Sequence, residues 1–468
     1  MQTKEKVGFQ RANTAMLAFK HQSVAGKSSS PYQSPVSSLP TDGYLVDRIR
    51  TIMISTADGF RILGVSGNSG STLGVSDCIC YENQQQPDEV FQDILDRWEM
   101  FRQENKFATR YNNPSGFLNM LGKAKEGSSQ PFALVVLNDQ DVCAVVNGTV
   151  GRERSVCKIG PVSTPSPVMQ RLAVGGSAFI HDGKHATIEI VSQILENLIT
   201  TKALDCIEML NLPVDNPWYD LIVGKKSVIW NSIAVPQIRW QTQLLDQETG
   251  ERLYFHSSKT RRKQRRQDRI LVETFSGDVS LREITEPDQV DGFIDAAAFI
   301  VEQTYQAGLG IGIQKDNKDL RDFLVELAEN RLLRGYLLEA EGKPIAYEVG
   351  DMQSGTFFAW ASSYLPEWSR LSPGIVLTNR IMDKQAKEGV GLYDFGSGDA
   401  AYKRILGSHR RDEADIILYA KRAIPYIAYQ QQKITMYVEA KSRQILTADG
   451  INKARRFWRK SLKFKVKK

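Results

Sequence analysis

Apolar residues recur along the chain with two spacings, which together predict an alternation of helices and strands. Short apolar runs bounded by glycine, proline, asparagine or aspartate predict strands, and apolar residues three and four positions apart predict helices. From about residue 77 both patterns are clear. They follow one another in the same order twice, roughly 200 residues apart, which indicates an internal repeat of structure.

The two halves are predicted to share one plan of strand, helix, three antiparallel strands, helix and strand. In the first half the predicted elements are a strand at 78–81, a helix that begins at 87 and runs past 98, strands at 132–137, 142–147 and 155–159, a helix at 187–200 and a strand at 204–210. In the second half they are a strand at 281–284, a helix from 287 to about 305, strands at 336–340, 345–349 and 356–361, a helix at 375–387 and a strand at 392–395. This order predicts an α/β fold with mixed, largely antiparallel sheets in two tandem domains.

Composition adds domain limits to this prediction. We expect a disordered, Ser/Pro/Gly-rich tail at 1–45, a first domain at 46–255 whose first strands are hard to place, a basic linker helix at 256–272, a second domain at 273–421 and a basic helical tail at 422–468.

The chain has the composition of a soluble globular protein, and it shows no long apolar run. Hydrophobic residues make up 41% and charged residues 24%. No stretch is apolar enough to predict a transmembrane helix, and the first residues lack the pattern of a signal peptide. The five cysteines are scattered, which indicates reduced thiols in a cytoplasmic protein. His181 and His185 have no third metal ligand nearby, so no metal site is predicted.

The net charge of +6 comes from two short segments. Residues 257–271 contain seven bases and one acid, and residues 453–468 contain nine bases and no acid, so the rest of the chain is net acidic. On a helix, Arg261 and Arg265 lie on one face, with Arg262 beside them. These side chains are candidates for binding phosphate groups, although dense charge is also typical of a solvated helix.

The candidate chemistry gathers between residues 372 and 407. Ser372, Pro373 and Gly374 stand at the predicted start of a helix, and the sequence Tyr-Asp-Phe-Gly-Ser-Gly-Asp at 393–399 forms a strand and a glycine turn before the pair Tyr402 and Lys403. A serine followed by proline is also a simple helix start, with the serine as cap.

These motifs, with the basic segment at 256–271, resemble the CelD/BcsL-like branch of the GNAT acetyltransferase superfamily, which is related to the FemAB peptidyl transferases. The resemblance is strongest over 256–271 and 335–407. The first half has no counterpart to the Ser-Pro-Gly or Tyr-Lys motifs, so it is expected to be a degenerate GNAT-like domain that has lost its acyl site.

The resemblance implies a donor site for acetyl-CoA or another acyl-CoA, and no metal. The residues expected to bind the donor are Arg370, Ser372, Gly374 and Ile375, although this phosphate loop has a single glycine where GNAT loops have paired glycines. Either CoA is held by fewer backbone donors than usual, or the donor is a different molecule.

The expected catalytic residues are Asp394, Tyr402 and Lys403. Asp394 is a candidate general base, with a turn cap as its alternative, and Tyr402 is a candidate proton donor to the departing thiolate. Lys403 is expected to stabilise the oxyanion, hold a phosphate or pair with Asp399, which is itself a turn or phosphate-binding residue.

The expected function is acyl transfer to an amine or hydroxyl of a saccharide or cell-envelope precursor, as in exopolysaccharide biosynthesis. A FemAB-like transferase that uses aminoacyl-tRNA is the alternative within enzymes, and a catalytically silent scaffold that binds polyanions is the alternative outside them. We expect a cytoplasmic protein, with the segment 453–468 as a candidate contact to the inner face of the membrane.

Overall fold

The computed structural model describes residues 49–55, 75–81, 89–105, 112–123, 129–138, 141–154, 157–159, 162–164, 166–223, 227–246, 248–253, 257–304, 306–307 and 311–445. The predicted tail at 1–45 and the basic segment at 453–468 lie outside these ranges. None of the helices in the described ranges is both long and apolar enough to cross a bilayer.

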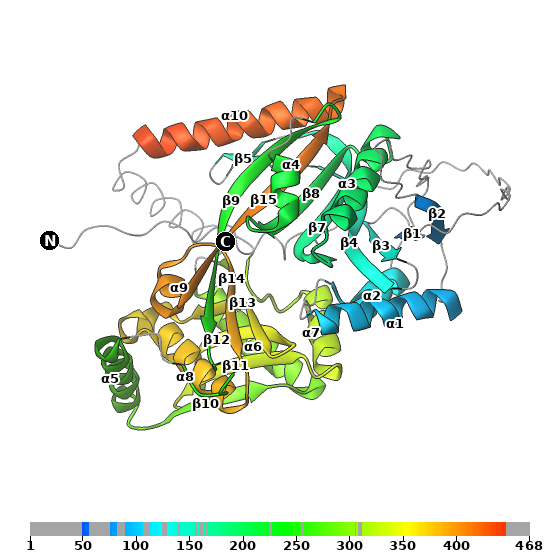
Figure 1. The fold of residues 1–468 in the computed structure, drawn as a ribbon. Helices are drawn as coiled ribbons and strands as arrows, with labels where there is room; N and C mark the ends of the chain where they lie inside the picture. The colour runs from blue at the N-terminus through cyan, green and yellow to red at the C-terminus, as the bar shows by residue number, and fades with distance from the viewer. Residues whose placement is uncertain are drawn as a thin grey trace.

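The first half of the chain forms one lobe (Figure 1). Its elements are β1 (Ile49–Ser55), β2 (Val75–Tyr81), α1 (Glu89–Glu104), α2 (Pro114–Lys123), β3 (Gln130–Asn138), β4 (Asp141–Arg154), β5 (Cys157–Ile159), β6 (Val162–Thr164), β7 (Val168–His181), α3 (His185–Thr200), β8 (Cys206–Pro213), α4 (Pro217–Val223) and β9 (Trp230–Gln243).

The second half forms the other lobe and ends in a long helix. Its elements are α5 (Ser258–Thr274), β10 (Val279–Ile284), the 3-10 helix η3 (Pro287–Gln289), α6 (Val290–Glu302), α7 (Lys318–Glu329), β11 (Leu333–Ala340), β12 (Lys343–Gln353), β13 (Thr356–Tyr364), the 3-10 helix η5 (Pro366–Leu371), α8 (Pro373–Lys387), β14 (Leu392–Ser397), α9 (Ala401–Leu406), β15 (His409–Ala420) and α10 (Ala423–Ile445).

The two lobes repeat one order of elements, so the predicted α/β fold with two tandem lobes is confirmed. In the first lobe, β3, β4 and β7 are antiparallel neighbours, and α3 crosses over to β8, which runs parallel to β7. In the second lobe, β11, β12 and β13 are antiparallel, and α8 crosses over to β14, which runs parallel to β13. Apolar side chains of α3 and α8 lie in the cores of their respective lobes.

One predicted strand is wrong. The third strand of the first lobe is β7 and not the segment at 155–159, because β7 matches the 14-residue length of β4 and pairs with it from Arg154 to Ala144. The short β5 pairs instead with β6 in a separate two-stranded sheet. The first strands are also resolved: β1 lies between β3 and β2, so β1 occupies the position that β10 has in the second lobe.

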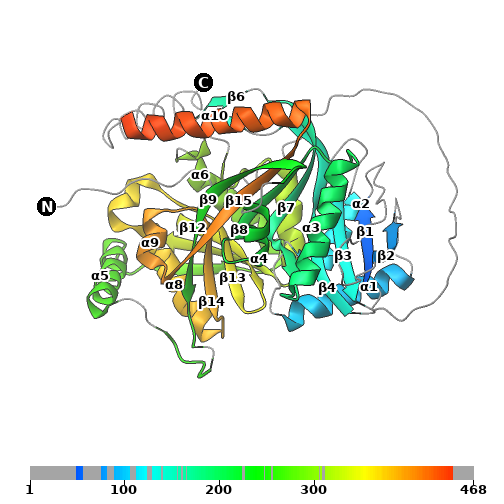
Figure 2. The same cartoon turned by 45° about the horizontal axis from the view of Figure 1, so that its top comes forward.

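The lobes exchange strands and so share a single sheet. The order of its thirteen strands is β10-β11-β12-β13-β14-β9-β15-β8-β7-β4-β3-β1-β2. The first lobe's last strand, β9, pairs with β14 of the second lobe, and the second lobe's last strand, β15, pairs with β8 of the first. Figure 2 shows β9 and β15 crossing together between the lobes. The predicted domain limits at 46–255 and 273–421 stay a prediction.

Candidate functional site

Strands β13 and β14 separate in the middle of the second lobe. They pair in parallel only from Thr356 to Phe358 and from Leu392 to Asp394. Beyond Phe358, β13 continues to Tyr364 while it pairs with β12 alone. In the described part of the chain, the edge of β13 from Ala359 to Tyr364 therefore has no strand partner on the side of β14. Such an edge presents backbone N–H and C=O groups to an extended ligand.

This open edge leads through η5 directly to the start of α8. Ser372, the residue before the helix, has a left-handed backbone with φ of 53°, which is uncommon for a residue with a side chain. Its side chain accepts no helix N–H group, so the interpretation of Ser372 as a simple cap is not supported by its contacts. A Cβ atom added to Gly374 would lie 3.2 Å from Cδ1 of Tyr364, so the glycine lets the end of β13 approach the helix.

The other two residues expected to bind the donor flank this helix start. Arg370 is exposed on η5, and Ile375 is half-buried against the second-lobe core. The structure therefore places Arg370, Ser372, Gly374 and Ile375 within one turn of the start of α8. The N–H groups in the first turn of a helix lack intrahelical partners and favour anions.

Asp394 lies at the point where the strands part, and its carboxylate is fully engaged. It is 1% exposed, and its oxygens accept hydrogen bonds from Arg239 Nη1 (2.9 Å), Gln241 Nε2 (2.8 Å) and the backbone N–H of Gly396 (2.7 Å). Arg239 also donates to Glu413 at 2.7 Å. Burial opposes the charge of Arg239, but these two carboxylates together raise its pKa. These contacts favour a positioning role for Asp394.

Lys403 is buried at the end of the same strand. Its Nζ donates to the carbonyl oxygens of Gly396 (3.0 Å) and Ser397 (2.9 Å). Burial lowers the pKa of Lys403 to about 7, with Arg239 acting in the same direction and Asp394 opposing the change. The amine is therefore near its titration point at neutral pH, and it ties α9 to the irregular end of β14.

Glu348 on β12 is a second buried titratable group, which the sequence analysis missed. Its Oε2 accepts a hydrogen bond from Thr378 Oγ1 of α8 at 2.7 Å, and Oε1 has no partner among the described residues. Burial raises the pKa of Glu348 to about 7, although Thr378 and the charge of Lys403 lower it. The available signal was a single acid in an apolar strand at 345–349.

Tyr402 and Asp399 have different surroundings from Lys403. The ring of Tyr402 meets Phe395 edge-on, with 6.3 Å between the ring centroids, and borders the second-lobe core. Asp399 accepts hydrogen bonds from Arg404 Nε (2.6 Å) and Trp240 Nε1 (3.2 Å), and Arg404 chiefly lowers the pKa of Asp399. The amine of Lys403 instead donates to backbone carbonyls.

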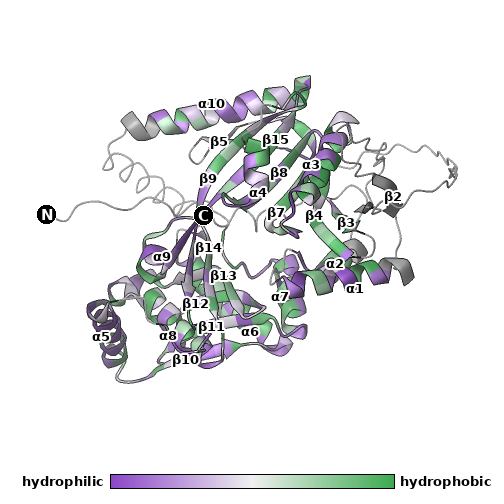
Figure 3. Cartoon of the chain, viewed as in Figure 1, coloured by the Kyte–Doolittle hydropathy of each residue, from purple (hydrophilic) through white to green (hydrophobic). Residues whose placement is uncertain are grey.

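The basic helix α5 packs beside α8 in the opposite direction. Asp268 pairs with Arg380 in the middle of α8 at 2.8 Å, and Phe275 contacts Trp368 of η5 with centroids 4.8 Å apart. Arg261, Arg262 and Arg265 precede Asp268, so they lie toward the C-terminal end of α8 and are not brought to Ser372. Figure 3 shows α5 as a strongly hydrophilic helix.

The remaining chemical groups of the described ranges, in either lobe, give no further site. Cys143 and Cys206 are buried free thiols, and burial raises the pKa of Cys206 to about 12. The described residues contain no group of three or more histidine, cysteine, aspartate or glutamate side chains placed to hold a metal ion. A cavity of about 340 Å³ lies at the far end of β9 and β15, at the start of α10. The candidate site is therefore located by the chemistry of the open strand edge rather than by a cavity.

A comparison with protein families gives a match within the second lobe. The family model Acetyltransf_6, an acetyltransferase (GNAT) domain, matches residues 258–404, from the start of α5 into α9. The predicted resemblance to the GNAT superfamily is thus confirmed for the second lobe. This match covers a part of the second lobe, which is therefore similar to GNAT acetyltransferase domains.

Solved structures with similar arrangements include FemX, with 9% identity, a TM-score of 0.49 and coverage of 72% of this chain and 97% of that chain. A tandem GNAT protein from the clavulanic acid biosynthesis pathway has 11% identity, a TM-score of 0.38 and coverage of 71% and 96%. A GCN5-related N-acetyltransferase from Sphaerobacter thermophilus has 10% identity, a TM-score of 0.35 and coverage of 72% and 95%. A search of curated proteins found no match.

Proposed function

We propose that the second lobe transfers an acyl group, most simply acetyl, from a CoA thioester to an amine or hydroxyl. The observation that carries this proposal is the open edge of β13, which ends at the start of α8 beside two buried groups that titrate near neutral pH. The amides of the pantetheine chain would pair with the strand edge at 359–364. The pyrophosphate would bind at Ser372 and Gly374, with Arg370 and Ile375 completing the donor site.

In this proposal Glu348 is the general base that removes a proton from the acceptor. A base works best when its pKa is close to the operating pH, and that of Glu348 is raised to about 7. Lys403 and Asp394 are positioning residues that hold the end of β14, because their polar atoms already contact Gly396, Ser397, Arg239 and Gln241. Tyr402 is the proton donor to the CoA thiolate.

We propose a saccharide or cell-envelope precursor as the acceptor, as in exopolysaccharide biosynthesis. This step rests on the resemblance to the CelD/BcsL-like branch. It would place the protein in the cytoplasm, with the basic segment 453–468 as a peripheral contact to the inner face of the membrane. In this proposal the first lobe helps to bind the acceptor.

A second candidate is a transferase that uses aminoacyl-tRNA as its donor. Exposed bases on α5 favour it: Arg262, Arg265 and Arg266 are all exposed on one helix beside α8. Such a surface fits a long polyanion better than it fits the phosphates of CoA, because Arg262 and Arg265 lie toward the C-terminal end of α8 and not at its start. In this version Asp399 and Arg261 belong to the phosphate-binding surface as well.

Calorimetric titration of acetyl-CoA, with desulfo-CoA as the non-reactive control, tests the donor site. Gly374→Trp should abolish binding because a Cβ at this position already presses on Tyr364. Gly292→Trp on α6 is the matched control, because its Cβ would meet no atom within 4 Å, and it should bind normally. Binding that survives in Gly374→Trp would refute the location.

Absence of CoA binding in the unaltered protein would refute the CoA donor and make aminoacyl-tRNA the next ligand. In that case Arg262→Glu with Arg265→Glu should weaken tRNA binding and reduce its salt dependence. If neither donor binds, the scaffold hypothesis is favoured.

A further inference from the structure

Helix α10 has one face on the sheet and an opposite face that exposes large apolar side chains. Ala428 and Thr435 are buried against the end of the sheet, where Tyr429 and Met436 also pack. Figure 1 shows α10 lying along the outer edge of the molecule. Ile427 and Ile434, seven residues apart and so on one face, are 57% and 60% exposed.

The apolar exposure on this helix is concentrated. Five of the thirteen large hydrophobic side chains that are exposed in the described part of the chain belong to α10: Ile424, Tyr426, Ile427, Ile434 and Tyr437. Elsewhere in the described ranges such side chains are spread over many elements. A grouped set of exposed apolar residues, unlike scattered ones, marks an interaction surface.

The same face carries bases and no acid. Lys433 and Lys441 are exposed there, and Lys441 lies over the ring of the exposed Tyr437, at 6.0 Å from the ring centroid. Glu439 is the one acid in α10, and it lies one turn beyond the buried Thr435, on the side of the sheet. In the sequence that follows, residues 453–468 add nine bases and no acid. This charge disfavours pairing with a second copy of the chain and favours an anionic partner.

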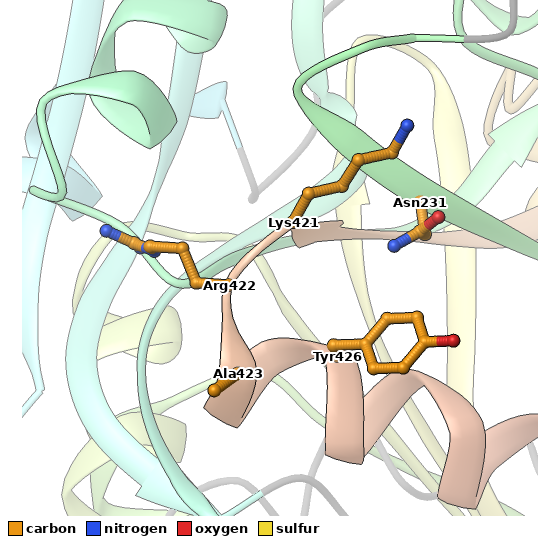
Figure 4. A pocket seen from close by; sticks show the side chains of 5 residues that line it. All are labelled: Asn231, Lys421, Arg422, Ala423 and Tyr426. Atoms are coloured by element: carbon orange, nitrogen blue, oxygen red, sulfur yellow. The ribbon is translucent and has the colours of Figure 1, made fainter.

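A cavity at the start of α10 adds a place for an anion. It is lined by Asn231, Lys421, Arg422, Ala423 and Tyr426. Figure 4 shows Lys421, Asn231 and Tyr426 on one side of the helix start, while Arg422 extends the other way. Arg422 is engaged with Asp205 at 2.9 Å, whereas Lys421 is exposed and contacts only a backbone carbonyl, that of Ser227, among its described hydrogen bonds.

We propose that the outer face of α10 docks on a membrane surface that contains anionic phospholipid. Ile424, Ile427 and Ile434 would enter the boundary between headgroups and acyl chains, and the tyrosines would lie at headgroup level. The lysines reach the phosphates, one of which would bind in the cavity beside Lys421. This inference goes beyond the proposed acyl transfer and stands without it.

Co-sedimentation of the full chain with vesicles tests the proposal. Vesicles of phosphatidylcholine alone are compared with vesicles that also contain phosphatidylglycerol, and only the second kind should bind the protein strongly. The double variant Ile427→Asp/Ile434→Asp should lower this binding by about tenfold or more, because both side chains lose apolar burial and gain charge repulsion. Phe299→Asp, an exposed apolar residue on α6, is the matched control and should bind normally.

Each other outcome overturns the proposal. Since the double variant keeps every base at 453–468, unchanged binding would assign the membrane contact to that segment alone. Equal binding to both kinds of vesicle would contradict the anionic surface, and no binding would contradict the membrane. Light scattering after gel filtration measures the oligomeric state. If the unaltered protein is a dimer, the double variant is a monomer and vesicle binding is unchanged, the face is a contact between two copies of the chain. Circular dichroism of both variants confirms that they fold.

Discussion

Replacing Lys403 by methionine should make the stability of the protein respond differently to pH. The side chain is 4% exposed, and burial lowers the pKa of its amine to about 7 from the ordinary value of 10.5. Between these two values the unfolded chain binds a proton that the folded chain does not bind. Raising the pH through this interval therefore favours the folded state, and Lys403→Met removes this contribution.

The difference between the two pKa values of Lys403 sets the size of this contribution to the free energy of unfolding. Each pKa unit between the folded and unfolded states corresponds to about 1.4 kcal/mol, so the whole interval is worth about 5 kcal/mol. Glu348, whose pKa is also about 7, titrates in the lower part of this range and is coupled to Lys403. The slope is best measured from about pH 8 to about pH 10, where the unaltered protein should gain about 3 kcal/mol relative to the variant.

Urea unfolding followed by tryptophan fluorescence measures this difference, since Trp240, Trp360 and Trp368 border the core of the second lobe. The quantity to plot is the free energy of unfolding of the unaltered protein minus that of Lys403→Met, at each pH, because the pH responses of the other groups then cancel. Lys387→Met supplies the control, because Lys387 is exposed at the end of the same lobe's helix α8. Its difference plot should be flat.

A flat plot for Lys403→Met would refute the reasoning. It would mean that the amine keeps an ordinary pKa in the folded protein, because its two carbonyl partners balance the loss of water. A plot that falls with pH would be a stronger contradiction, because it would require the fold to favour the charged amine.

Two further predictions concern the neighbours of Lys403. Glu348→Gln should lower kcat by about 10²- to 10⁴-fold, and the rise of kcat/KM with pH through about 7 should disappear. Thr378→Val should move that rise to higher pH, because the hydrogen bond from Thr378 lowers the pKa of Glu348. An unchanged pH profile in both variants would exclude Glu348 as the base. Arg239→Met should lower the free energy of unfolding by about 3–5 kcal/mol near pH 7 in urea titrations, because two buried carboxylates lose their cation. The exposed Arg410→Met should change it by less than about 0.5 kcal/mol, and equal losses in the two variants would contradict the argument.

The elements around the open edge were predictable because their signals are local. Proline and glycine mark the start and end of α8, and the apolar spacing between them is helical. The glycines at 396 and 398 have φ of 71° and 99°, so their turn was visible in the sequence. The motifs thus lie at a helix start, at a strand end and in the turn after it.

The contacts that decide the roles of these residues were not predictable, because they join distant segments. Asp394 is engaged by Arg239 and Gln241, which precede it by about 150 positions and reach it only through the strand exchange. Glu348 is a candidate base because burial beneath α8 raises its pKa, and the sequence around it does not predict that burial. The third strand of the first lobe was predicted at 155–159 because this short apolar run follows β4 more closely in sequence than β7, the strand that pairs with β4.

The exchange of β9 and β15 also has a consequence for how the chain folds as it is synthesised. The first lobe's strand β8 ends at Pro213, but its partner β15 begins at His409, about 200 residues later. Until then the edge of β8 has no native neighbour on that side. Nascent chains therefore expose this strand edge while about 200 further residues are synthesised, and they cannot close the first lobe before the second is nearly complete. The last strand of the sheet to emerge is the one that joins both lobes.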